Sequence, residues 1–227
     1  MDLDGYSDTT TSFFTLDACD GDLAKKIMSV LSLTGEDLEQ SWKQLISKNP
    51  EMESRLRSQG IDSPEIRGEI EWDDAVILFT CTLKINNQNR PIQLGEQLSK
   101  ERFGRFPWGD GSATKYLIEY LRPNNSSISS KESYDKMMNL LERMNTYCIK
   151  EPHGDKKYAN GLGGLNICGI LDMNEAHELR KYFTGRMWSV SADEPLDGGV
   201  RDAIKHLVLI LKSAERRGVG VMLRSHA

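Results

Sequence analysis

The stretch 197–227 constrains the fold more than any other part of the chain. Apolar residues recur at helical spacing over 200–211, and Asp197 stands where it could cap the first turn of a helix. Gly218 follows two arginines, at the place where helices commonly end in a left-handed residue. The apolar run 219–223 that comes next is typical of a buried strand. The chain therefore ends in helix, glycine and strand.

This final helix carries more apolar residues than one stripe requires. Leu209 and Ile210 lie off the main stripe, so the helix is apolar nearly all round at this level. Such a helix is expected to be covered on both sides. We expect the N-terminal half of the chain to provide the cover, with a second copy of the chain, and hence a homodimer, as the alternative.

The first hundred residues predict a cluster of helices with a small β element. Asp20 or Asp17 is expected to cap the first helix, which follows a short strand. The run 75–85 is rich in β-branched and aromatic residues, which favours a strand, with a helix as the alternative. The expected helices cover 20–31, 34–49 and 50–59, and the expected strands cover 13–16, 75–85 and 90–94.

The second half of the chain predicts a smaller α/β unit. The segment 123–133 is rich in serine and asparagine and indicates a linker or surface loop. Asp172, with Glu175 three residues later, predicts a capping box. The expected helices after this segment are 134–147, 173–184 and 199–217, with strands at 165–171 and 219–223.

These patterns together predict an α+β fold. A helix-rich acidic lobe would span 1–122, and an α/β lobe would span 134–227, with its small sheet packed by helices. The alternative is one compact domain, in which the strand that begins at Phe13 joins the same sheet. A chain of 227 residues is long enough for either arrangement.

Composition excludes several classes of protein. The chain is 38% hydrophobic and 28% charged, which is ordinary for a folded soluble protein, and its longest apolar runs are far shorter than the roughly 20 residues that cross a bilayer. The acidic first residues carry no apolar segment, so we expect no secretory signal, a cytoplasmic location and reduced cysteines. Residues 1–122 have a net charge of -7 and residues 123–227 of +2, so nucleic acid is an unfavourable partner for the first half.

Few residues are spaced for catalysis. His153, with Asp155 beside it in a polar loop, is the best candidate for proton transfer, and Cys168 is a candidate nucleophile only if it is exposed. The glycines at 161–164 precede a predicted strand rather than a helix, which is the wrong order for a phosphate loop. The other histidines do not converge, and the four cysteines lack metal-ligand spacing, so we expect no metal and no cofactor.

The segment FGRFPWGDGS at 103–112 is the most distinctive loop. It interleaves aromatic residues, arginines and glycines, a composition found on many binding surfaces. The alternative is that its aromatic residues cover the core. The candidate binding residues are Arg102, Phe103, Arg105, Phe106, Trp108 and Asp110.

Three functional hypotheses follow from these observations. The first is a cytoplasmic protein-binding module of regulatory, inhibitory or immunity type, whose acidic face docks onto a basic protein. The second is a hydrolase-like enzyme that uses His153 with Asp155. The third is a weak nucleic-acid binder, in which the C-terminal lobe would use Lys156, Lys157, Arg216 and Arg217.

Overall fold

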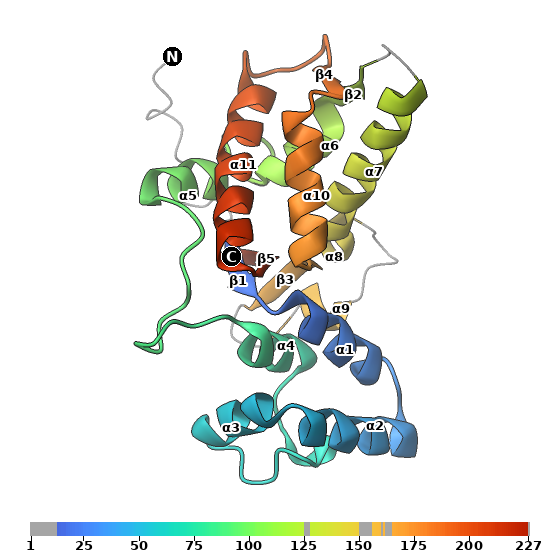
Figure 1. Ribbon diagram of the computed structural model, residues 1–227, viewed down its shortest axis with the longest axis vertical. Helices are drawn as coiled ribbons and strands as arrows, with labels where there is room; N and C mark the ends of the chain where they lie inside the picture. Colours follow the sequence, from blue (N-terminus) through green and yellow to red (C-terminus); the bar gives the residue numbers. More distant parts are fainter. Residues whose placement is uncertain (1–12, 125–127, 150–155, 160, 162–164, 227) are drawn as a thin grey trace.

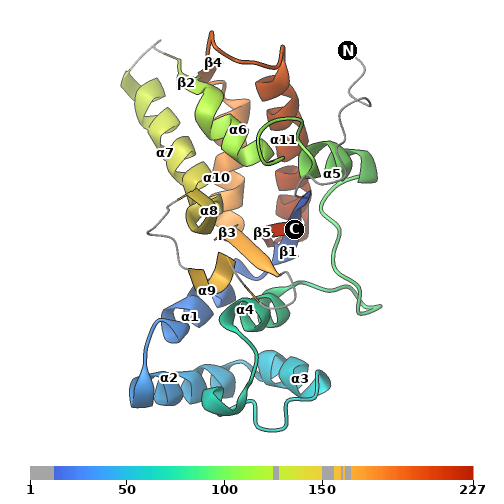
Figure 2. The ribbon, with the colours of Figure 1, turned by 180° about the vertical axis from the view of Figure 1, so that it is seen from behind.

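The fold is built on a three-stranded antiparallel sheet with helices on both faces. The computed structural model describes residues 13–124, 128–149, 156–159, 161 and 165–226. The sheet has the order β1-β5-β3, and Figures 1 and 2 show helices above and below it. Its strands are β1 (Phe13–Cys19), β3 (Asn166–Leu171) and β5 (Gly220–His226). The α+β class expected from the sequence is confirmed.

The central strand β5 ties the two ends of the chain together. Leu16 of β1 lies opposite Leu223, and Ile170 of β3 lies opposite Met222. The residues of β5 from Gly220 to Leu223 are buried, because side chains of this strand enter the cores on both faces of the sheet. The first strand therefore belongs to the same sheet as the last two, as the one-domain alternative expected. The division at 123–133 into separate lobes stays a prediction.

The upper face of the sheet carries one hydrophobic core. Phe14, Leu16 and Ala18 alternate toward this face from β1 and join Val221 and Leu223 of β5. Figure 1 shows the covering helices standing above the sheet. They are α5 (Gln97–Gly104), α6 (Ala113–Tyr120), α7 (Ile128–Met144), α10 (Met173–Thr184) and α11 (Gly199–Arg217), and the short α8 (Thr146–Ile149) follows α7.

The lower face carries a second core. Cys19, Ile167, Ile170 and Met222 point to this side and pack with residues of the N-terminal helices, Trp42 among them. The elements nearest this face are α1 (Gly21–Leu31), α4 (Asp74–Thr82) and α9 (Lys156–Ala159). A further layer below them, seen in Figure 1, consists of α2 (Gly35–Lys48), α3 (Pro50–Ser58) and the 3-10 turn η2 (Arg67–Glu69).

The C-terminal helix and strand agree with the sequence, but the helix cap does not. Gly218 adopts the left-handed conformation with φ 62°, and β5 follows it directly. Gly198 is the N-cap of α11, so the expectation that Asp197 caps this helix is wrong. The carboxylate of Glu194 instead accepts a hydrogen bond from the Val200 amide. A carboxylate near a helix N-terminus also suits the helix dipole.

The run 75–85 is mainly a helix, so the predicted strand is wrong there. Asp73 caps α4 by accepting a hydrogen bond from the Val76 amide at 2.8 Å. Ile77, Leu78 and Cys81 are buried against the lower core, and this burial overrides the strand preference of β-branched residues. Beyond the helix, single bridges join Leu83 to Cys19 and Ile85 to Pro91. The second bridge shows that the chain turns back between Ile85 and Pro91.

Two regular elements reach into the segment 123–133 from its two sides. Residues 121–123 form β2 (Leu121–Pro123), which pairs with β4 (Trp188–Val190), although no strand was predicted at either place. Helix α7 starts at Ile128 rather than at 134. The first turns of this helix include the charged residues Lys131 and Glu132, which are exposed. A helix turn that covers no core leaves no periodic signal in the sequence.

The cover on α11 is partly as expected. Helices α5 and α6 pack against it, and Ile210 is only 2% exposed beside Gly95. Leu209 is 46% exposed, however, so no other part of the described chain covers the helix on this side. Cover by a second copy stays a prediction. None of the helices in the described ranges is long and apolar enough to cross a membrane.

Candidate binding surface at the aromatic loop

The loop between α5 and α6 has a tightly defined backbone. The Phe106 amide donates to the Gly111 carbonyl, and the Gly111 amide donates to the Trp108 carbonyl, both at 2.9 Å. Gly109 and Gly111 have φ values of 55° and 85°, where any other residue would be strained. The side chain of Ser112 then caps α6. These backbone hydrogen bonds and glycine conformations therefore set the position of Trp108.

The six predicted binding residues divide between core and surface. Phe103 and Phe106 are 2% and 6% exposed and belong to the upper core, as the alternative interpretation expected. Trp108 is half-buried, whereas Asp110 is exposed. The other two, Arg102 and Arg105, are exposed as well, and the Arg105 guanidinium lies 5.5 Å from the centre of the Phe13 ring. The part of the prediction that concerns a surface therefore rests on Trp108, Asp110 and the arginines.

Trp108 rests on two tyrosines that sequence reasoning did not select. Its ring meets Tyr116 edge-on at 5.3 Å and Tyr120 edge-on at 5.7 Å. Tyr116 and Tyr120 are one helical turn apart on α6, and their ring centres lie 4.7 Å apart. This i, i+4 spacing was the available sequence signal for an aromatic face.

Tyr116 connects this aromatic group to the start of α11. Its hydroxyl donates to Glu194 at 3.1 Å and accepts from the Leu196 amide at 3.3 Å. Burial and the neighbouring Glu194 carboxylate raise the pKa of Tyr116 well above its ordinary value. The phenol therefore stays a donor at neutral pH. Glu194 is 78 positions from Tyr116, so no local pattern could have revealed the contact.

An open depression lies beside Trp108. It has a volume of about 350 Å³, and Lys115 on its rim forms an ion pair with Asp110 at 2.6 Å. Because the hollow is open to solvent, it would enclose only part of a bound ligand. We call it the Trp108 surface, and its lining residues are Trp108, Gly109, Asp110, Lys115, Ile118 and Glu119.

A second polar cluster joins the two terminal strands at the lower face. The Thr15 hydroxyl donates to Asp17 at 2.9 Å and lies 3.0 Å from His226 Nε2, while Arg224 donates to Asp17 at 2.7 Å. Burial and the Arg224 charge lower the pKa of His226, although Asp17 opposes them. The Arg224 guanidinium also lies 4.2 Å from the centre of the Phe79 ring. This cluster was missed because it depends on the pairing of strands at opposite ends of the chain.

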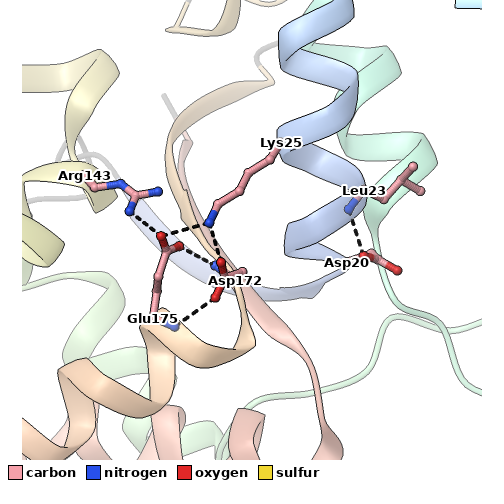
Figure 3. Close-up of polar contacts among 6 residues, drawn as sticks. All are labelled: Asp20, Leu23, Lys25, Arg143, Asp172 and Glu175. Atoms are coloured by element: carbon pink, nitrogen blue, oxygen red, sulfur yellow. Dashed lines mark hydrogen bonds and ion pairs between the residues drawn. The ribbon is translucent and has the colours of Figure 1, made fainter. Parts of the chain in front are cut away.

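Figure 3 shows a third polar group, an ionic cluster of four side chains at the N-terminus of α10. Asp172 and Glu175 form a complete capping box, as predicted. Lys25 of α1 donates to both carboxylates, and Arg143 of α7 donates to Glu175. Each of the four carboxylate oxygens accepts at least one hydrogen bond. The cluster therefore joins α1 and α7 to the start of α10.

Only one of the three residues of the enzyme hypothesis lies in the described part of the chain. His153 and Asp155 lie outside the described residues. Cys168 is fully buried in β3, where a thiol is not accessible to a substrate. His177 contacts Glu215 at 2.7 Å on the α10–α11 surface. Across the described ranges, no group of three or more histidines, cysteines and acids is placed to hold a metal ion.

The basic residues of the nucleic-acid hypothesis come from two different elements. Lys157 of α9 donates to the Leu31 carbonyl at 2.9 Å and pairs with Asp74 at 3.5 Å. Arg217 at the end of α11 donates to Ser213, while Arg216 is exposed. Two of the predicted cations are therefore engaged within the protein.

Comparison with known proteins adds no relative from which to transfer a role. No family model, no curated protein and no solved structure matches the chain. Function must therefore be inferred from the geometry of the chain itself.

Proposed function

We propose that the protein is a cytoplasmic protein-binding module that docks a partner on the Trp108 surface. The proposal assigns it no chemical reaction: it acts through contact, as a regulatory, inhibitory or immunity protein does. The observation that carries the proposal is the position of Trp108, which is half-buried on Tyr116 and Tyr120 and lines an open depression.

Two physical arguments support this surface. Tryptophan and tyrosine are the residue types that most often dominate the binding energy of protein interfaces, because they bury a large area at a small entropic cost. Trp108 is also fixed by a loop whose Gly109 and Gly111 conformations are set before binding. A preorganised loop avoids the ordering cost that a mobile loop would add.

Site-specific photo-crosslinking tests the proposal without knowledge of the partner. A benzophenone amino acid replaces Glu119, which is exposed on the Trp108 surface, or Glu51, which is exposed on α3 at the far end of the molecule. In cells that make the protein, we expect a discrete crosslinked species from position 119 and none of the same mass from position 51. Identical patterns from both positions, or no product from position 119, would contradict the proposal.

A substitution then links the product to the surface itself. Trp108→Ala removes the indole, and we expect it to abolish the crosslink from position 119 while thermal unfolding stays cooperative. If Trp108→Ala does not fold, Ile118→Ser takes its place, since it alters only a half-buried side chain of the same depression. Persistence of the crosslink in the folded variant would count against the Trp108 surface.

A further inference from the structure

We propose that the group bound at the Trp108 surface is a cationic side chain, a lysine or arginine in a basic segment of the partner. This inference rests on the proposed function and specifies its partner. It follows from two features that lie together: an aromatic corner and an excess of acidic side chains around it.

The aromatic corner is made by Trp108 and Tyr120. The two rings meet at 87° with their centres 5.7 Å apart, and Trp108 lines the depression. The face of an aromatic ring is electronegative and attracts a cation placed within about 6 Å of its centre, most strongly for tryptophan. Trp108 is the ring that lines the depression, so we expect a long cationic side chain to stack on this ring.

Acidic groups surround the corner. Glu119 lines the depression and is exposed, and Asp193 is exposed near Tyr120. Burial, a hydrogen bond to Glu119 and the charges of Glu119 and Asp193 raise the pKa of Tyr120. Within the ranges that the structure describes, neither carboxylate forms an ion pair with a residue of the chain.

The cations nearby are already engaged. Lys115 pairs with Asp110 at 2.6 Å on the rim of the depression. Arg122 donates to the backbone carbonyls of Glu119 at 2.6 Å and of Leu121 at 2.8 Å. Three carboxylates, those of Asp110, Glu119 and Asp193, stand against these two cations, so the net charge around the corner is negative and an acidic segment would be repelled.

Three peptide probes of equal length discriminate between classes of partner. They place arginine, glutamate or leucine at alternating positions in an otherwise glycine–serine sequence. The probes are titrated into the intact protein, and the indole N–H signal of Trp108, assigned with Trp108→Phe, is followed by NMR. We expect the arginine peptide to shift this signal, the Trp42 signal to stay in place, and the other two peptides to cause no saturable shift. An equal response to the leucine or the glutamate peptide would overturn the inference.

Matched charge variants separate a local effect from overall attraction to an acidic protein. The double variant Glu119→Gln with Asp193→Asn is expected to raise the dissociation constant of the arginine peptide at least about threefold. Glu36→Gln with Asp62→Asn removes the same charge at exposed positions near α2 and α3, and we expect an unchanged dissociation constant. Equal weakening in both variants, or none in either, would refute recognition at this corner.

The two proposals fail in different ways. A crosslink from position 119 without a response to the arginine peptide would contradict the inference of a cationic side chain. The proposal that the Trp108 surface binds a protein would still stand. A specific response to the arginine peptide with no crosslink in cells removes the protein partner, and the surface would then be a site for small cations.

Discussion

Lys25 of α1 donates a hydrogen bond to the carboxylate of Asp172, the residue that caps α10. The two residues are 147 positions apart in the chain. Asp172 follows β3 directly, as Asp20 follows β1, and each aspartate caps the helix that comes next. Lys25 therefore joins two strand–aspartate–helix units that lie at the two edges of the sheet. Gly21 and Gly220 allow the close approach, because a Cβ at either would press against the backbone at Asp172.

Loss of Lys25 is expected to destabilise the fold. Lys25→Met keeps the aliphatic length but leaves Asp172 and Glu175 without their shared donor. We expect a loss of about 1–2 kcal/mol in the free energy of unfolding, because hydrogen bonds to charged groups are worth about this much when partly exposed. Urea denaturation measures the change. Lys26→Met, at the next and exposed position, is the control, and an equal loss in both variants would show that the cluster has no special role.

Acid is expected to weaken the same region. Burial alone would raise the pKa of Asp172, but hydrogen bonds from Lys25 and the Glu175 amide outweigh it and lower the pKa. Asp20 has a lowered pKa for the same reasons, with Lys84 and the Leu23 amide as donors. Because both folded pKa values lie below the unfolded ones, their stabilisation is complete at neutral pH and is lost as pH falls below about 4.

Asparagine substitutions test this pH dependence. Asp20→Asn with Asp172→Asn keeps side chains that can cap a helix and removes both titrations. The variant is expected to be less stable than the wild type at pH 7, and its melting temperature should fall less between about pH 5 and about pH 2. Asp62→Asn with Asp135→Asn, at two exposed positions, should leave the acid profile unchanged. Parallel profiles for wild type and the first variant would contradict the prediction.

Adjacent residues of α11 are expected to respond in opposite ways to charge. Ile210 is buried under α5, so Ile210→Glu places an unpaired carboxylate in the core and should cost at least about 3 kcal/mol or prevent folding. Leu209 is 46% exposed, and Leu209→Glu should change stability by no more than about 0.5 kcal/mol. Thermal melts compare the two. A large loss from Leu209→Glu, particularly with a change in sedimentation, would indicate that a second copy covers this side chain.

Local chemistry explains the successful predictions. The capping box of Asp172 and Glu175 is contained in four residues, and the order of final helix, Gly218 and strand is contained in one stretch. Such signals act between neighbours in sequence, so they can be recognised without the fold. The run 75–85 failed for the opposite reason: its residue types favour a strand, and only the lower core made it a helix.

The candidate surface was half predictable. The loop at 103–112 stands out in composition, and it contains Trp108 and Asp110. Which aromatic residues face outward depends on packing, however, and Phe103 and Phe106 are buried in the upper core. Glu194, which holds both Tyr116 and the start of α11, comes from a segment expected to be a loop.

The sequence by itself determined the start of α10 and the end of α11, because caps, glycines and apolar periodicity act over a few residues. Tertiary structure decided which of those elements meet. Pairing of β1 with β5 brings Thr15 to His226, although 211 positions separate them, and the position of α1 against β3 brings Lys25 to Asp172, which follows that strand. Contacts of this kind depend on the burial of two sheet faces at once, which is a property of the whole chain rather than of any segment.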